Sequence, residues 1–97
     1  MTPLNVTLAI STGAANLLLV FDVPIASPNP APPATWTLNG LAGQIGAPMD
    51  SGVNWVVYAI AGALVPGDLV HVLGGTAYVH SFDGGSLVAS TNTLPND

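Results

Sequence analysis

Residues 53–73, VNWVVYAIAGALVPGDLVHVL, decide the fold. Residues 53–60 are rich in Val, Trp, Tyr and Ile, which suit the pleated, half-buried surface of a β-strand. Pro66-Gly67-Asp68 is a strong turn signal, and residues 69–73 are again mostly apolar. Both apolar runs are short, β-branched and bounded by turn residues, which favours strands over helices. The stretch therefore predicts two strands joined by a turn at the centre of a β-sandwich.

Strand signals recur along the rest of the chain. The clearest is in residues 4–10, where larger apolar side chains alternate with others. The inward set expected in that strand is Leu4, Val6, Leu8 and Ile10. The remaining predicted strands are residues 17–23, 35–39, 41–47, 76–82 and 87–91. Seven or eight short strands separated by turns predict a single all-β sandwich domain spanning residues 1–97, with mainly antiparallel pairing.

Residues 24–35 interrupt this pattern with five prolines. Proline lacks the backbone donor and fixes φ, so this stretch cannot be a central strand. We expect a stiff, extended proline-rich loop outside the sandwich, with contact to a neighbouring subunit as the functional alternative.

The charge composition excludes several classes of function. The 97 residues include no Lys, Arg, Glu or Cys, and five Asp give a net charge of −5. Without basic side chains the chain cannot neutralise phosphates, so we expect neither nucleic-acid binding nor attraction to anionic membranes. Apolar residues make up 49% of the chain, and only 5% are charged. Such a surface predicts burial against partner proteins.

Targeting signals are weak. No charged segment precedes a long apolar run, and no run reaches the roughly 20 residues that cross a bilayer. We therefore expect no signal peptide, and synthesis and assembly in the cytoplasm.

Few residues offer chemistry. His71 and His80 could form a site with Asp68 or Asp83, but a third ligand in register and a nucleophile motif are missing from the pattern. Asp22 and the Asp83-Gly84-Gly85 loop could bind calcium, although one carboxylate per loop is few for that ion. We expect no enzyme activity, no cofactor and no metal.

The two tryptophans are predicted to differ. Trp36 shares a face with Leu38 and is expected in the core. Trp55 is expected to point outward as an interface anchor, because aromatic residues are enriched at interfaces. A carbohydrate platform at Trp55 is the alternative, and it would need further coplanar aromatic side chains.

Several motifs resemble bacterial Ig-like repeat domains of the SwmB-like kind, which occur in cell-surface and phage virion proteins. Residues 16–25, NLLLVFDVPI, are similar to that family's L-x-V-x-F-S-x-P-V strand, and residues 36–40, WTLNG, to its F-x-V-x-N-G segment. Residues 66–72, PGDLVHV, and 83–89, DGGSLVA, resemble two later motifs in the same order. The resemblance implies an Ig-like β-sandwich.

The resemblance also implies which side chains point inward. The inward set it implies is Leu17, Leu19, Phe21, Val56, Tyr58, Ile60, Val70 and Val72. The predicted strands at residues 17–23 and 53–60 would then lie side by side in one sheet. Their outward positions carry apolar residues where the family usually has Thr or Ser. The predicted interface residues are Leu18, Val20, Trp55, Val57, Leu69, His71 and Leu73.

From these observations we expect a non-enzymatic structural virion protein, such as a capsid decoration or head or tail accessory protein. Its partners would be further copies of itself, the major capsid protein or another virion protein. One Ig-like repeat of a secreted adhesin or surface-layer protein, located outside the cell, is the alternative. A carbohydrate-binding module is the third.

Overall fold

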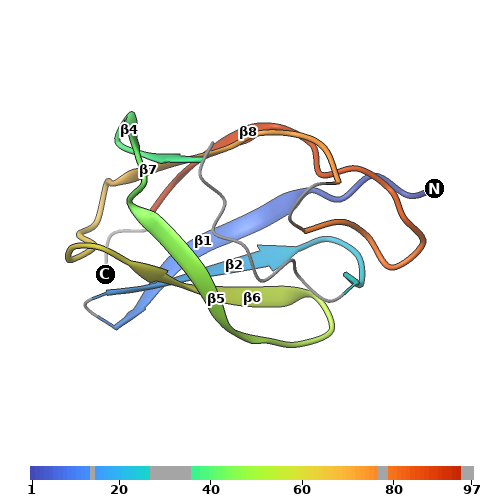
Figure 1. Ribbon diagram of the computed structural model, residues 1–97, viewed down its shortest axis with the longest axis horizontal. Coiled ribbons are helices and arrows are strands. Elements are labelled where there is room, and N and C mark those ends of the chain that lie inside the picture. Colours follow the sequence, from blue (N-terminus) through green and yellow to red (C-terminus); the bar gives the residue numbers. More distant parts are fainter. Residues whose placement is uncertain (14, 27–35, 77–78, 95–97) are drawn as a thin grey trace.

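The computed structural model describes residues 1–13, 15–26, 36–76 and 79–94, and every regular element within them is a β-strand (Figure 1). The eight strands are β1 (Val6–Gly13), β2 (Asn16–Phe21), β3 (Thr37–Leu38), β4 (Leu41–Ala42), β5 (Ile45–Ser51), β6 (Trp55–Ile60), β7 (Leu69–Val72) and β8 (Ser90–Thr93). They form two four-stranded sheets, so the predicted all-β sandwich is confirmed.

The sheet topology is Ig-like. The first sheet has the order β1-β2-β6-β5 and the second β4-β3-β7-β8, with every strand pair antiparallel. This is the arrangement of an immunoglobulin constant-type sandwich, with β4 added at the edge of the second sheet.

The two strands predicted within residues 53–73 are present as β6 and β7. The two strands in this stretch do not pair with each other, because β6 lies between β2 and β5 whereas β7 lies between β3 and β8. The connection 61–68 is longer than the two to five residues usual in a hairpin, and it carries the chain from one sheet to the other. Leu64 within it is buried. Each strand is central, but in its own sheet.

The predicted inward phase of these strands is confirmed. The side chains named above on β2, β6 and β7 are all buried, from 0% exposed for Leu17 to 7% for Ile60. Trp36 is 1% exposed, as expected for a core residue, and meets Tyr58 edge to face with ring centroids 5.4 Å apart. The core therefore joins both sheets through aromatic and aliphatic side chains.

The predicted phase of residues 4–10 is wrong beyond Val6. Val6 pairs with Phe21 but Leu8 pairs with Val20, so Thr7 is an extra residue in β1. Such a bulge moves the following side chains to the other face. Ala9 is consequently buried at 3% exposure, whereas Leu8 is 42% exposed.

Other boundaries also differ from the prediction. Residues 41–47 are divided between β4 and β5, because Gly43 turns the chain with φ of +76°. Residues 76–82 contain no strand in their described part, and Ser81 makes only an isolated bridge to Ile25. The last strand begins at Ser90 instead of residue 87.

The proline-rich loop is described only at its start. Ile25 is 8% exposed, and its amide donates to the carbonyl of Val53. The first residues of the loop are therefore packed on the sandwich, contrary to prediction, while residues 27–35 lie outside the described part of the chain.

Candidate interaction surface

Four of the predicted interface residues form neighbouring pairs on the outer side of the first sheet. Leu18 of β2 lies opposite Val57 of β6, and Val20 lies opposite Trp55. All four side chains are half-buried, in alternation with fully buried neighbours on the same strands. The expected apolar patch is therefore present as a continuous block across two central strands.

The bulge in β1 extends this block. Leu8 lies opposite Val20, and Ile10 lies opposite Leu18. Two cross-strand rows result, Leu8–Val20–Trp55 and Ile10–Leu18–Val57. We call these six residues the outer apolar face. Leu8 and Ile10 were assigned to the core from sequence, and only the register of β1 reveals their position.

Trp55 lies close against the backbone of the strand connection before β6. A Cβ placed on Gly52 would overlap Nε1, Cε2 and Cζ2 of the indole, so only glycine allows this contact. The Gly52 amide donates to the Trp55 carbonyl over 2.9 Å and closes the turn beneath the ring. The indole consequently spreads over the turn as an apolar, half-buried surface.

Beyond the row of Ile10, Leu18 and Val57, the next outward positions on β5 and β6 are the small residues Gly46 and Ala59. Asn16 lies opposite Ala59, and a Cβ on Gly46 would lie 3.2 Å from the Ala59 carbonyl oxygen. Asp50 lies opposite Val57 at the β5 edge and is the one charged residue that the described register pairs into this region. The outer apolar face therefore carries its largest side chains in the row of Trp55, and the surface beyond the row of Val57 carries small ones. Within the described strands, Asp50 is its one charged neighbour.

The other predicted interface residues lie on the opposite side of the sandwich. Leu69 is 45% exposed, and Leu73, just after β7, is 41% exposed. Thr37, His71 and Thr91 form one row across the second sheet, and His71 Nδ1 is 2.9 Å from Thr91 Oγ1. We call Thr37, Leu69, His71, Thr91 and Thr93 the mixed outer face. The seven predicted residues thus divide between two surfaces.

Three carboxylates cap turns at the ends of the sandwich. The Asn39 side chain lowers the pKa of Asp68, which also accepts from the Val65 amide over 2.9 Å. The amide of Asn5 lowers the pKa of Asp22 in the same way. These carboxylates fix loops through hydrogen bonds to their ionised form.

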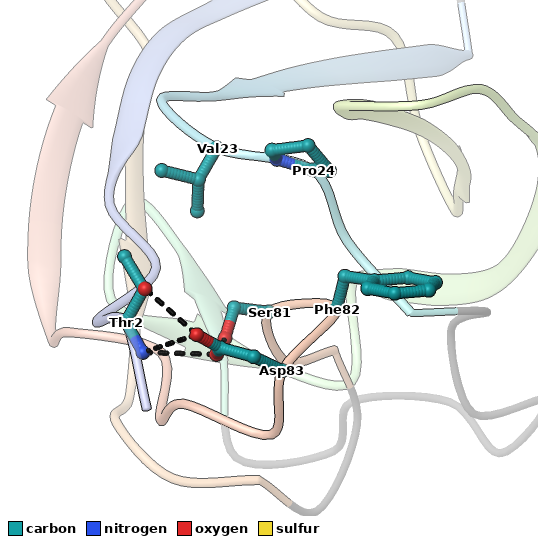
Figure 2. A pocket seen from close by; sticks show the side chains of 6 residues that line it. All are labelled: Thr2, Val23, Pro24, Ser81, Phe82 and Asp83. Carbon is teal, nitrogen blue, oxygen red and sulfur yellow. Dashed lines mark hydrogen bonds between the residues drawn. The ribbon is translucent and has the colours of Figure 1, made fainter.

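Asp83 makes the most extensive of these contacts. Its carboxylate accepts from Ser81 Oγ over 2.6 Å and from the amide and hydroxyl of Thr2 (Figure 2), and the Ser81 bond is the main cause of its lowered pKa. Thr2 passes so close to Gly85 that a Cβ there would overlap the Thr2 carbonyl. Asp83 therefore ties the start of the chain to the turn 81–85.

The metal sites that were weighed from the sequence, although not expected, gain no support from this geometry. Within the described ranges, no group of three or more His, Asp or Glu side chains could hold an ion. The oxygens of Asp22 and Asp83, the proposed calcium ligands, already accept hydrogen bonds from Asn5, Thr2 and Ser81.

A shallow groove of about 250 Å³ lies beside the Asp83 cluster (Figure 2). It is lined by Thr2, Val23, Pro24, Ser81, Phe82 and Asp83. Phe82 is 79% exposed, although sequence placed it at the end of a strand. The polar groups of Thr2, Ser81 and Asp83 are hydrogen-bonded to one another, so the groove presents a mainly apolar wall to a ligand.

The comparisons with known proteins bear on the fold. No protein-family model matches the chain, and no curated protein matches it. The N-terminal part of the bacterial S-layer protein SbsC is similar in structure, with a TM-score of 0.68 and 15% identity over 99% of this chain and 24% of that one. The S-layer protein rSbsC(31-844) gives a TM-score of 0.67 and 18% identity over 99% of this chain and 14% of that one.

These likenesses support the β-sandwich fold. The chain spans about a quarter or less of the two solved structures it matches. Among the described residues, no helix is long and apolar enough to cross a bilayer. The resemblance to SwmB-like repeats stays a prediction.

Proposed function

We propose that this chain is a non-enzymatic structural module of an extracellular protein layer on a bacterial cell surface. The observation that carries the proposal is its likeness, over 99% of its length, to segments of two S-layer proteins. That likeness favours the surface-layer alternative over the virion protein first expected from sequence.

The outer apolar face gives this proposal a physical basis. A solvated sheet usually alternates apolar inward and polar outward side chains. On β2 and β6 the outward positions 18, 20, 55 and 57 are Leu, Val, Trp and Val. Contact with a neighbouring protein would remove these side chains from water, and a layer provides such neighbours permanently.

The absence of catalytic function is also part of the proposal. The carboxylates of Asp22, Asp68 and Asp83 accept hydrogen bonds inside turns. A carboxylate that acts as a general acid or base near neutral pH usually has a raised pKa, whereas the pKa of each of these is lowered.

Immunogold labelling of intact source cells tests the proposal. Antibodies raised against the purified chain should decorate the outside of unpermeabilised cells, and protease treatment of those cells should remove the label. Label confined to phage particles, or seen only after permeabilisation, would contradict the cell-surface assignment and favour the virion alternative.

A further inference from the structure

The outer apolar face has a graded height along the strands. The outward residues of β6 are Trp55, Val57 and Ala59, in order of decreasing size. Ala59 is flanked by Asn16 and by Gly46, which has no side chain. The region therefore descends from the row of Leu8, Val20 and Trp55 through a middle row to a low end.

A graded surface of this kind is complementary to a second copy of itself. Rotation by 180° about an axis along the middle row, Ile10–Leu18–Val57, places the bulky end of one copy over the low end of the other. Close packing needs such alternation of large and small side chains, and a two-fold axis supplies it twice. Rotation about an axis along the strands would instead set Trp55 against bulky residues and leave a gap at Ala59.

Charge also favours a copy of this chain as the occupant. The chain has no Lys or Arg, so a second copy cannot pair with its carboxylates and must meet it through uncharged surface. The six residues of the outer apolar face are all uncharged. Asp22, Asp68 and Asp83 are held in turns by hydrogen bonds. A basic partner would find one carboxylate, Asp50, at the edge of this face, and the carboxylates of Asp22, Asp68 and Asp83 only at the turns.

We propose that the outer apolar face binds the same face of a second copy, sheet against sheet, about a two-fold axis that passes beside Val57. This rests on the proposed function, because it names the partner of a structural module. Trp55 of each copy would cover Ala59 of the other.

The size of the face sets the strength of this contact. The outer apolar face, together with the row of Asn16 and Ala59 and the β5 edge beside it, spans four strands at about 4.8 Å spacing and three rows of side chains, which cover roughly 400 Å². Standard stable interfaces use about 800 Å² per partner. A single pair would therefore associate weakly, and contacts made by other surfaces in a layer would be needed to hold it persistently.

Asp50 adds a check on the orientation. It extends the middle row beyond Val57, so the proposed axis brings the Asp50 residues of two copies toward each other. At about 8 Å in water two like charges repel by roughly 0.5 kcal/mol, or about twofold in the association constant. Asp50→Asn should therefore strengthen the contact by about that factor.

Cysteine cross-linking tests the proposal, because the chain has no cysteine of its own. Packed sheets lie about 10 Å apart, too far for a disulfide but suited to a short bismaleimide. We compare Val57→Cys, on the axis, with Ala59→Cys, on the same strand but away from it, and with Thr37→Cys on the mixed outer face. Circular dichroism melting verifies that all three variants fold.

Val57→Cys should give cross-linked dimer at least about tenfold faster than either control, since a formed contact raises the local thiol concentration. Equal cross-linking of Ala59→Cys would overturn the two-fold orientation. Equal cross-linking of Thr37→Cys, or none at Val57→Cys at high protein concentration, would overturn the pairing of two copies. Surface labelling without cross-linking would leave the proposed function intact, and cross-linking without surface labelling would leave the pairing intact.

Discussion

The two outer faces of the sandwich differ, although both cover the same core. On the second sheet, the outward row Thr37–His71–Thr91 is polar, and His71 and Thr91 are in hydrogen-bonding contact. On the first sheet, the rows Leu8–Val20–Trp55 and Ile10–Leu18–Val57 contain only apolar side chains. The outer side of the second sheet thus mixes polar side chains with the exposed Leu69, whereas these two rows of the first sheet are entirely apolar.

This difference separates the side chains that the core requires from those that it does not. Inward and outward side chains alternate along β7, so Val70 and Val72 point inward at 0% exposure and His71 points outward. The strands β2 and β6 keep the same inward alternation without a polar outward set, a pattern typical of strands covered on both sides. The outward Leu and Trp of the first sheet are thus not explained by the core.

The largest expected effect concerns the inner and outer sides of β2. Leu19→Ala should destabilise the fold by about 2–5 kcal/mol, because Leu19 is 0% exposed and its loss leaves a cavity. Leu18→Ala, one residue away on the half-buried side, should cost less than about 1.5 kcal/mol. Urea unfolding measures both. Equal losses would mean that Leu18 belongs to the core.

A smaller effect is expected beneath Trp55. Gly52→Ala should cost about 1–3 kcal/mol and shift the tryptophan fluorescence, because the added methyl overlaps the indole and displaces it. Gly62→Ala is the control, since no atom lies within 4 Å of a Cβ there. An unchanged spectrum in Gly52→Ala would show that the indole does not lie over this turn.

Acid should weaken the ends of the sandwich and not its faces. The pKa values of Asp22, Asp68 and Asp83 are lowered in the folded chain, so the stability they add is complete above about pH 4 and is lost as the pH falls below it. The melting temperature should therefore fall between pH 5 and pH 2.5, and Asp68→Asn should reduce the dependence. A flat profile would contradict the turn-capping role of these carboxylates.

The smallest effect is expected at Tyr58. Burial raises the pKa of its hydroxyl, which has no hydrogen-bond partner among the described residues. Tyr58→Phe removes the unpaired group and should leave stability unchanged or raise it by up to about 1 kcal/mol. Thermal melting of the variant checks this, and a loss above about 1 kcal/mol would indicate a partner for the hydroxyl.

Alternation predicted the core, and the Ig-like resemblance predicted the one pairing that was named, that of β2 with β6. Alternation and family resemblance placed Val56, Tyr58, Val70 and Val72 inward, where the structure has them. Alternation alone could not tell that β6 and β7 lie in different sheets, because it describes one strand at a time and says nothing about its partner. The eight residues between these strands were the available signal.

The candidate surface was predicted only in part. Leu18, Val20, Trp55 and Val57 were found from their phase on central strands. Leu8 and Ile10 were missed because one extra residue at Thr7 reverses the phase, and a bulge leaves no signal in the alternation itself. Leu69, His71 and Leu73 were grouped with them because sequence cannot separate two sides of a sandwich.

Neighbouring substitutions on β6 test the central claim most directly. Trp55→Ala should weaken self-association or incorporation into the native layer by about 30-fold or more, as expected for an aromatic anchor, with little change in melting temperature. Val56→Ala, 0% exposed, should lower the melting temperature and leave association of the folded chain unchanged. Sedimentation and thermal melting of both variants provide the measurement. If Trp55→Ala unfolds the domain or leaves assembly unchanged, the outer apolar face is not an assembly surface.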